Sequence, residues 1–322
     1  MTTRSHRLFV GTIGEGLWRS LDGGETFTRT CDGMFVECHV RALAVHPYEP
    51  RVLYLGSEQG LFRSDDGADS WKRVESPLNG LPIWSVLLLP GAPDVIVVGT
   101  CPARLFRSGD GGRTWSDADA RIRTDCPRII HTRVTALCAH PGDARKVWAG
   151  VEIDGVFRSH DGGNSWTAVG QGLSSQDIHA MAYIPETGRL LASTNNDVNV
   201  SLDDGDTWRP LKLHETLPVR YFRGLTQRCD RPEVVLLGNG DAPPGTTGLV
   251  VRSLDGGVTW QPAQMPGRAN STIWNFAVHA ADPDLAFASS VSGEVYRSVD
   301  GGATWQKLAR EFGEIRALAW TP

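Results

Sequence analysis

Arginine side chains stand at matching positions of separate segments, and the chemistry they share is anion binding. Arg41, Arg223 and Arg316 each begin a short segment in which apolar and small residues alternate, and Arg133 stands two positions before the matching place of another segment. A guanidinium group matches the geometry of carboxylate, sulfate and phosphate, and several converging guanidinium groups need an anion or acidic side chains nearby. We therefore predict that these four arginines form a cradle for an anion.

Aromatic and polar residues occupy the same position in the remaining segments. They are Trp84, Thr135, His179 and Trp274, while Tyr221 lies two positions before Arg223. Indole rings offer the flat apolar walls that sugar rings and aromatic ligands prefer. We predict a pocket that recognises a small anionic or sugar-like molecule, with ligand-binding residues Arg41, Arg133, Arg223, Arg316, Trp84, Trp274 and His179. The alternative is a structural network in which each arginine pairs with a carboxylate such as Glu37, Asp177 or Glu314.

Histidines near three of these segments suggest a metal site. His39, His131 and His179 begin or precede the segments, and three imidazoles with an open position suit Zn, Fe or Cu. Glu58, Glu152 or Cys101 could complete the ligand set. Because the three histidines are not at equivalent positions, the alternative is that they are solvated or hydrogen-bonded.

Carboxylates in predicted loops are candidates for catalysis. Glycoside hydrolysis uses two acids that face each other across a cleft, and Glu15, Glu58, Glu152 and Asp241 lie in loops where such a pair could form. Tyr221 is a further candidate catalytic residue. A metal-dependent or carboxylate-dependent hydrolase or lyase is therefore an alternative function at the same pocket, and the sequence leaves catalysis undecided.

These residues must be positioned by a repeat. The pattern S-x-D-x-G-x-[TS]-[WF] occurs seven times, at residues 20–27, 64–71, 108–115, 159–166, 201–208, 253–260 and 298–305. The final aromatics are 44, 44, 51, 42, 52 and 45 residues apart, and another 44 residues close the circle from Trp305 to Phe27. Such a period is typical of a four-stranded propeller blade.

Each octet is expected to form a tight turn. Its aspartate can accept hydrogen bonds from backbone N–H groups of the turn, and its glycine can take a positive φ. Ala68 at a glycine position and the additional Asp204 predict looser turns in two units. The arginine that precedes most octets is expected to link neighbouring strands or units; it recurs at Arg19, Arg63, Arg107, Arg158, Arg252 and Arg297.

The octet resembles the Asp-box, or BNR, repeat. The propeller superfamily with this repeat includes sialidases, xyloglucan-hydrolysing glycosidases, sortilin-type receptors and photosystem II assembly factors. The resemblance implies an all-β, seven-bladed β-propeller of four-stranded antiparallel blades. True sialidase activity is disfavoured, because the chain has no Arg-Ile-Pro signature near its start. The assembly factors have a similar length and an arginine-rich face, which implies a protein-binding scaffold as a further alternative, with a protein partner on the top face.

We predict one domain, residues 1–322, whose last strand closes the ring by pairing with the first blade. The expected blades are 8–30 plus 314–322, 39–75, 82–118, 132–170, 177–212, 220–263 and 272–309. The octets should lie on one face. The long connections 116–132, 209–220 and 239–247 should lie on the opposite face, where function is expected because loops on a rigid frame commonly carry it.

Two further rows follow the polar row along the innermost strands. The small row is Ala42, Ser85, Ala136, Ala180, Gly224, Asn275 and Ala317. The apolar row is Leu43, Val86, Leu137, Met181, Leu225, Phe276 and Leu318. We expect the small row to face the crowded axis and the apolar row to pack between blades.

Composition excludes several classes of protein. With 40% hydrophobic residues, 36 Gly, 19 Pro and a net charge of −5, the 322 residues match neither disorder, collagen nor a coiled coil. No apolar run is long enough to span a membrane, and the lack of a basic block argues against nucleic acid. Without a recognisable leader the chain is expected to be cytoplasmic, with its six cysteines as free thiols.

Overall fold

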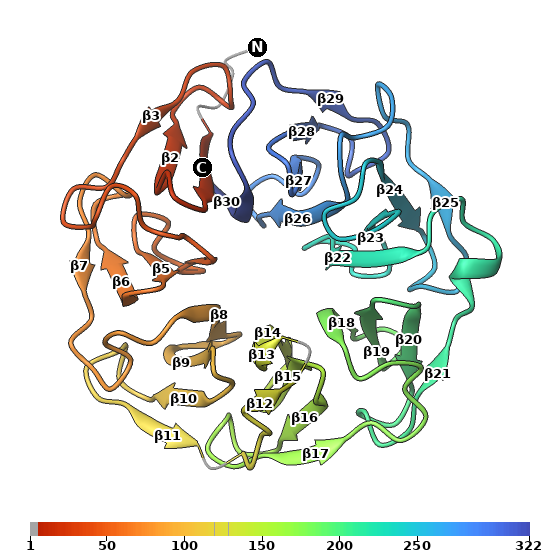
Figure 1. Ribbon diagram of the computed structural model, residues 1–322, viewed down its shortest axis with the longest axis horizontal. Coiled ribbons are helices and arrows are strands. Elements are labelled where there is room, and N and C mark those ends of the chain that lie inside the picture. Colours follow the sequence, from red (N-terminus) through yellow and green to blue (C-terminus); the bar gives the residue numbers. More distant parts are fainter. Residues whose placement is uncertain (1–5, 119, 128) are drawn as a thin grey trace.

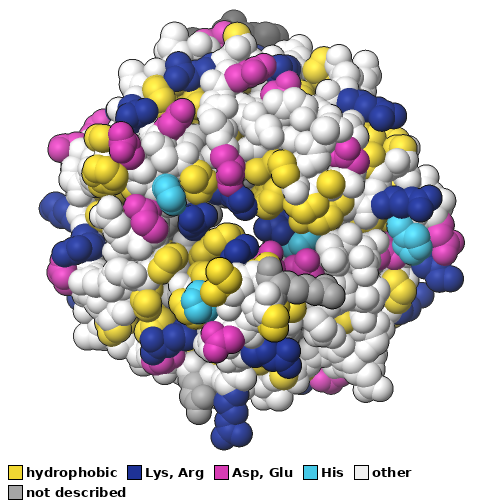
Figure 2. Space-filling view, viewed as in Figure 1, with side chains coloured by type: hydrophobic (Ala, Val, Ile, Leu, Met, Phe, Trp, Pro, Cys, Tyr) yellow, Lys and Arg dark blue, Asp and Glu magenta, His cyan; other side chains and the backbone are white. Residues whose placement is uncertain are grey.

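The computed structural model describes residues 6–118, 120–127 and 129–322. Within these residues, seven four-stranded antiparallel sheets surround a central axis (Figure 1), and the ring is hollowed at its centre (Figure 2). One end strand of each sheet lies at the axis and the other lies at the rim (Figure 1). In six sheets the axial strand is the first of its sheet in the chain, and in the seventh it is the C-terminal strand β30. The predicted all-β, seven-bladed propeller is therefore confirmed.

The blades follow the chain in order. Blade 1 contains β1 (Arg7–Thr12), β2 (Leu17–Ser20), β3 (Thr28–Arg29) and β30 (Ile315–Thr321). Blades 2 and 3 contain β4 (Ala42–Val45), β5 (Leu53–Ser57), β6 (Gly60–Ser64), β7 (Lys72–Arg73), β8 (Ile83–Leu89), β9 (Ala92–Thr100), β10 (Leu105–Ser108) and β11 (Ser116–Ala118). Blade 4 contains β14 (Arg133–His140), β15 (Asp143–Glu152), β16 (Gly155–Ser159) and β17 (Thr167–Val169).

The remaining blades have the same plan. Blades 5 and 6 contain β18 (Ile178–Ile184), β19 (Arg189–Thr194), β20 (Val198–Ser201), β21 (Arg209–Pro210), β22 (Tyr221–Gln227), β23 (Val235–Gly240), β24 (Gly248–Ser253) and β25 (Gln261–Pro262). Blade 7 contains β26 (Ile273–Val278), β27 (Ala286–Ser290), β28 (Val295–Ser298) and β29 (Gln306–Lys307). A hairpin of β12 (Asp125–Cys126) and β13 (Ile130–His131) precedes blade 4, and a short 3-10 helix, η1 (Leu213–Glu215), follows β21.

The two ends of the chain close the ring. β30 pairs antiparallel with β1, with Leu8 opposite Trp320 and Val10 opposite Leu318. Blade 1 therefore takes its innermost strand from the C-terminal end of the chain and its other three from the N-terminal end. This pairing confirms the predicted closure, which removes the unpaired sheet edge that an open ring would leave.

Neighbouring blades meet through a repeated close contact. Gly56 of β5 faces Ile83 of the next blade so closely that a Cβ atom on Gly56 would lie 2.6 Å from Ile83 Cγ2. The same contact joins Gly11 to Val40, Gly99 to Val134, Gly150 to Ile178 and Gly238 to Ile273. At these places a glycine on the second strand receives a β-branched side chain from the innermost strand of the next blade.

The octets form seven turns with one hydrogen-bond pattern. In the first, Asp22 accepts hydrogen bonds from the hydroxyls of Ser20 and Thr26 at 2.7 and 2.6 Å and from the backbone N–H of Thr26 at 2.9 Å. Equivalent bonds surround Asp66, Asp110, Asp161, Asp203, Asp255 and Asp300. The hydrogen bond from the Thr114 hydroxyl, together with the other donors of its turn, lowers the pKa of Asp110 to about 2.

The expectation of looser turns is wrong for the unit with Ala68 and holds in one respect for the unit with Asp204. In the latter the backbone N–H of Asp206 bonds to the carbonyl of Asp203 at 3.2 Å, whereas the equivalent N–H of Asp69 bonds to the Asp66 carboxylate at 3.0 Å. Ala68 and Asp204 adopt φ values of 67° and 58°, so both take the left-handed conformation that glycine takes in the other turns. The hydroxyl and backbone bonds to Asp66 and Asp203 have the same lengths as those elsewhere, between 2.6 and 3.0 Å. The set of hydrogen bonds to the aspartate fixes the turn strongly enough to hold a non-glycine residue there.

Arginines link six of the seven octet turns to the blade before them. Arg19 donates to the carbonyl of Gly67 in the next blade at 2.9 Å, and five of the six predicted arginines make such a bond. The fifth blade has valine at this position, and Arg189 of β19 donates to Gly256 instead. Arg252 differs, because among the residues described its side chain makes no such bond to the octet of the next blade, and its buried Nε has no partner. The expected structural link between blades is confirmed for the other five.

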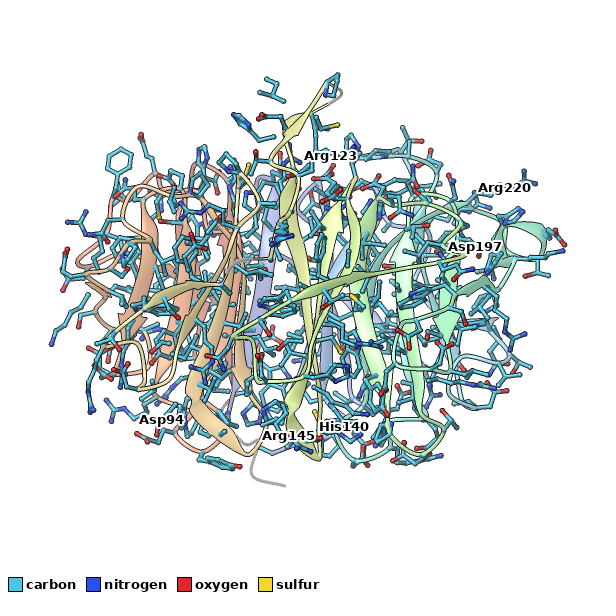
Figure 3. The ribbon with its side chains drawn as sticks, turned by 90° about the horizontal axis from the view of Figure 1, so that it is seen from below. Asp94, Arg123, His140, Arg145, Asp197 and Arg220 are labelled. Atoms are coloured by element: carbon cyan, nitrogen blue, oxygen red, sulfur yellow. The ribbon has the colours of Figure 1, made fainter. Side chains whose placement is uncertain are left out.

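The octets lie on one face of the ring and the hairpin on the other. The N–H group of the fourth octet residue bonds to a carbonyl near the start of the second strand of the same blade, as Gly111 does to Asp94 and Gly162 to Arg145. Figure 3 shows Asp94 and Arg145 at one face and Arg123, Asp197 and Arg220 at the opposite face, from which the hairpin projects. The described residues include no helix that could cross a membrane, and all six cysteines are free thiols.

Replacement of Gly56 by alanine tests the contact between blades. The new Cβ would lie 2.6 Å from Ile83 Cγ2, so we expect Gly56→Ala to lower the free energy of unfolding by about 1–3 kcal/mol. Urea unfolding followed by tryptophan fluorescence measures the change. Gly142→Ala is the matched control, because its Cβ would meet nothing closer than 3.5 Å and should leave stability equal or slightly higher. Equal stability of the two variants would contradict the inter-blade contact.

Candidate functional site

The innermost strands enclose a cavity of about 340 Å³ on the propeller axis. Its lining consists of the three rows of residues that alignment of the repeats brings together, seven residues in each row. At its mouth are Arg41, Trp84, Thr135, His179, Arg223, Trp274 and Arg316. Figure 2 shows Lys or Arg side chains together with hydrophobic side chains at the edge of the central hollow.

The expectation that the apolar row packs between blades is wrong. The apolar residues Leu43, Val86, Leu137 and Phe276 are only half-buried and line the cavity, and the small residues, which also border it, lie against the neighbouring strands. Ala42, for example, lies 3.2 Å from the position of a Cβ on Gly56, and Ser85 donates a hydrogen bond to Val134 of the next blade at 2.8 Å. Alternation along a strand forces this result, because the apolar row lies two residues after the polar row and shares its face.

Arginine and tryptophan side chains are stacked at the mouth. Trp84 has two guanidinium groups over its ring, those of Arg41 and Arg133, with centroid distances of 4.9 and 4.6 Å. Trp274 likewise has Arg223 and Arg316 at 4.2 and 4.5 Å. Each tryptophan is therefore flanked by one arginine from each neighbouring blade, and cation–π attraction holds the four guanidinium groups in place.

Two of these four arginines have carboxylate partners and two do not. Arg133 pairs with Glu152 at 2.9 Å, and Arg316 pairs with Glu314. Among the residues described, Arg41 and Arg223 form no ion pair with a carboxylate; Arg41 contacts His39 Nδ1 at 3.2 Å, and Arg223 lies 3.5 Å from the Tyr221 hydroxyl. The structural-network alternative therefore accounts for Arg133 and Arg316 only.

The surroundings of the two unpaired arginines oppose their charge. Burial lowers the pKa of Arg41, and the positive charges of Arg316 and Arg133 lower it further. Burial also lowers the pKa of Arg223, whose residue is only 6% exposed, and Arg316 adds to this effect. The mouth thus brings like charges together in a partly desolvated place.

His179 belongs to a buried network rather than to the open surface. Its Nδ1 bonds to the carbonyl oxygen of Phe222 at 2.6 Å, its Nε2 lies 3.4 Å from Asp177, and its ring is tilted against Tyr221. Burial and the positive charge of Arg223 lower its pKa, against the effect of Asp177. Burial also raises the pKa of Tyr221. Burial and Arg223 thus favour the neutral imidazole, whereas the contacts with Asp177 and Phe222 favour its protonated form, and the net shift of the pKa is downward.

The three histidines predicted to hold a metal are not brought together. His39 contacts Arg41, His179 is buried beside Asp177, and His131 lies on β13, where it pairs with Asp125 at 3.3 Å. In the described part of the chain no group of three His, Cys, Asp or Glu side chains has the arrangement of a metal site. The expected Zn, Fe or Cu site has no ligand set among these residues.

The predicted catalytic carboxylates are already engaged. Glu58 accepts a hydrogen bond from the His39 backbone at 2.7 Å, and Glu152 pairs with Arg133. Asp241 accepts bonds from the backbone and hydroxyl of Thr246, both at 2.8 Å, and so holds its own loop. Cys101, a suggested metal ligand, is half-buried, which raises the pKa of its thiol although Arg133 opposes the rise. These residues act as local partners in the structure.

A second cavity on the same face adjoins the connection 209–220, one of the three loops on which the sequence analysis expected function. It measures about 580 Å³ and lies beside η1, lined in part by Asn195, Asp197, Lys212 and His214. Buried Asp197 accepts backbone hydrogen bonds from Lys212 and Leu213 at 2.6 and 2.9 Å and holds the turn into η1. The contribution of residues 195–197 to its wall was not predicted.

The fold and the arrangement of the axial residues define a seven-bladed β-propeller with an arginine-lined axial cavity. The DUF6242 beta propeller domain family matches residues 131–313, which is more than half of the 322 residues. The chain belongs to this family.

Curated relatives are xyloglucanases that are much longer than this chain. A probable oligoxyloglucan-reducing end-specific xyloglucanase of Neosartorya fischeri is 25% identical over 228 residues, which are 68% of this chain and 26% of the relative. The xyloglucanase of Hypocrea jecorina is 29% identical over 48% of this chain and 18% of its own length. This chain therefore spans about a quarter or less of these two relatives.

Solved structures show the same fold at low identity. An ancestral GH74 enzyme aligns with a TM-score of 0.65 and 17% identity over 94% of this chain and 39% of its own. YCF48 bound to D1 peptide aligns with a TM-score of 0.65 and 18% identity over 92% of this chain and 89% of its own. At these identities the likeness is one of fold.

The buried imidazole of His179 predicts a pH-dependent stability. Because burial lowers its pKa in the folded state, the unfolded chain binds the proton more tightly, and the free energy of unfolding should fall as the pH falls below about 6.5. We expect His179→Gln to lose less stability than the parent protein between pH 7.5 and pH 5, as measured by urea unfolding. His160→Gln, at an exposed histidine of an octet, should keep the parent profile. Identical profiles for all three proteins would contradict this assignment.

Proposed function

We propose that this propeller binds a small molecule carrying a carboxylate or another anionic group at the mouth of its axial cavity. The observation that supports it is the pair Arg41 and Arg223, which line the mouth without an ion-pair partner among the residues described. Their guanidinium groups supply the charged donors that a carboxylate, sulfate or phosphate accepts. Arg133 and Arg316 add positive charge beside them.

The energetic reason is the unfavourable free energy of two partly buried guanidinium charges that have no ion-pair partner. A charge removed from water is unfavourable unless it is paired, and nearby charges of the same sign increase the cost. Glu58 and Glu314 oppose this effect at Arg41, as Glu152 and Asp177 do at Arg223, but none of them pairs with either arginine. An anion held between Arg41 and Arg223 would supply the missing partner.

The proposal concerns binding rather than catalysis. Glu58, Glu152 and Asp241 each hold a backbone group or an arginine, so none is a free acid or base facing the mouth. The matched relatives called xyloglucanases support a ligand site on a propeller of this kind, and the structure of YCF48 bound to D1 peptide shows that a propeller of the same fold can bind a partner. We also infer that the seven octets are Asp-box repeats, on the basis of their common serine–aspartate–threonine hydrogen bonds.

Removal of either unpaired arginine should abolish most of the binding. We expect Arg41→Gln and Arg223→Gln to weaken binding of the best anion at least about tenfold each, because a hydrogen bond to a charged group contributes roughly 1.5–3 kcal/mol. Isothermal titration calorimetry with acetate, benzoate, glucuronate, phosphate and sulfate identifies that anion in the parent protein. The control is Arg73→Gln on the rim strand β7, which should bind as the parent does.

The melting temperature separates binding from folding in the same proteins. Loss of binding with a nearly unchanged melting temperature supports the proposal, and the double variant Arg223→Ala/Arg316→Ala should behave in the same way. A collapse of the melting temperature would assign a structural role to these arginines instead. If no anion in the panel binds to the parent protein, the proposed function is wrong.

A further inference from the structure

The axial cavity changes from charged to apolar along its depth. Its mouth carries Arg41, Arg223 and Arg316, and two residues deeper along each strand stands the apolar row of Leu43, Val86, Leu137, Met181, Leu225, Phe276 and Leu318. We propose that the ligand is an amphiphile, in which an anionic head meets the arginines and an apolar chain or ring lies along the axis. This inference rests on the proposed function and names the class of ligand.

Three polar side chains of the cavity wall already have partners. Thr135 donates its hydroxyl hydrogen to the carbonyl oxygen of Ile178 at 2.6 Å, and Ser85 donates to Val134 at 2.8 Å. Asn275 donates from its side-chain amide to the Ser289 hydroxyl at 3.2 Å. These three side chains therefore offer few free hydrogen-bonding groups to the hydroxyls of a buried sugar, and a polar group buried without a hydrogen bond is unfavourable. An apolar body avoids this cost.

The arrangement of the two tryptophans also disfavours a sugar as the ligand. Trp84 and Trp274 each carry two guanidinium groups within 5 Å of the ring centroid, so arginines lie over the rings on which a sugar would stack. Their stacking instead fixes the guanidinium groups at the mouth. The mouth therefore carries fixed positive charges, and the apolar row lies deeper in the cavity.

Apolar side chains continue along the axis beyond the apolar row, which we call the floor of the cavity. A second cavity of about 390 Å³ shares Leu43, Phe276 and Leu318 with the axial cavity and is otherwise lined mostly by apolar residues, including Val45 and Trp320. The three shared side chains therefore border both spaces. Among the residues described, no Lys, Arg, Asp or Glu belongs to the apolar row or lines the lower cavity, whose polar side chains are His279 and Cys229. A chain that enters from the mouth meets mostly apolar side chains once it has passed the arginines.

A series of alkyl carboxylates tests both halves of the proposed ligand. Calorimetric titration of the intact protein with acetate, butanoate, hexanoate and octanoate, at submicellar concentrations, should show binding that tightens about threefold to fourfold for each added methylene until the cavity is filled. Octanol, which has the chain without the charge, should bind at least about tenfold more weakly than octanoate. Glucuronate, which has the charge on a sugar ring, should also bind more weakly than octanoate.

Variants in the apolar row distinguish the contact with the alkyl chain of the ligand from the contact with its carboxylate. Leu137→Asn places a polar group in the apolar row and should weaken octanoate binding about tenfold while it leaves acetate binding unchanged. Val86→Thr, which keeps the side-chain shape, should have the same effect to a smaller degree and serves if Leu137→Asn does not fold. Leu202→Asn replaces an exposed leucine of an octet and should leave both affinities unchanged.

The outcomes distinguish this inference from the function on which it rests. If acetate or glucuronate binds as tightly as octanoate, or if the floor variants weaken both acids equally, the amphiphile is wrong and the anion site remains. If octanol binds as tightly as octanoate, the charged head has no role and the proposal is overturned. If neither acetate nor octanoate binds, the anion site itself is wrong.

Discussion

The contact between a glycine on the second strand of one blade and a β-branched residue on the innermost strand of the next is the constraint on which the structure depends. At Gly56 and Ile83, at Gly99 and Val134 and at Gly150 and Ile178, backbone meets side chain with no room for a further methyl group. Close packing of this kind fixes the separation of the blades. Because the innermost strands are held at one distance, equivalent residues on seven strands lie at the same depth around the axis.

This frame explains how like-charged side chains can be held together at the mouth. Arg41 and Arg316 are close enough for the charge of one to lower the pKa of the other, and neither can withdraw without leaving Trp84 or Trp274. The indole between each pair of guanidinium groups stabilises both through its negative faces. On the opposite face, the octet turns and the arginines between them connect neighbouring blades. The residues at the mouth are therefore not needed to hold the blades together.

The sequence predicted more of the fold than of the chemistry. The spacing of the octets indicated seven blades and closure by the last strand, because the hydrogen bonds of each turn are made by residues within one octet. Alignment of the repeats also indicated which residues share a level of the axis. It did not indicate which arginines are paired: Glu152 reaches Arg133 and Glu314 reaches Arg316, while Glu58 instead accepts a bond from the backbone of His39. Which carboxylate pairs with which arginine depends on side-chain distances at positions that the repeat does not share.

The sequence by itself determined the turns, the blade count and the rows of side chains, since these follow from local hydrogen bonding and from the alternation of residues along a strand. Only the tertiary structure decided which rows of side chains point toward the axis. The apolar residues line the cavity there, and the small residues allow neighbouring strands to approach closely. It also separated His131, on a projecting hairpin, from the buried His179. The reason is physical: a turn is formed by neighbours in the chain, whereas a site is formed by the distances between blades, which no single segment contains.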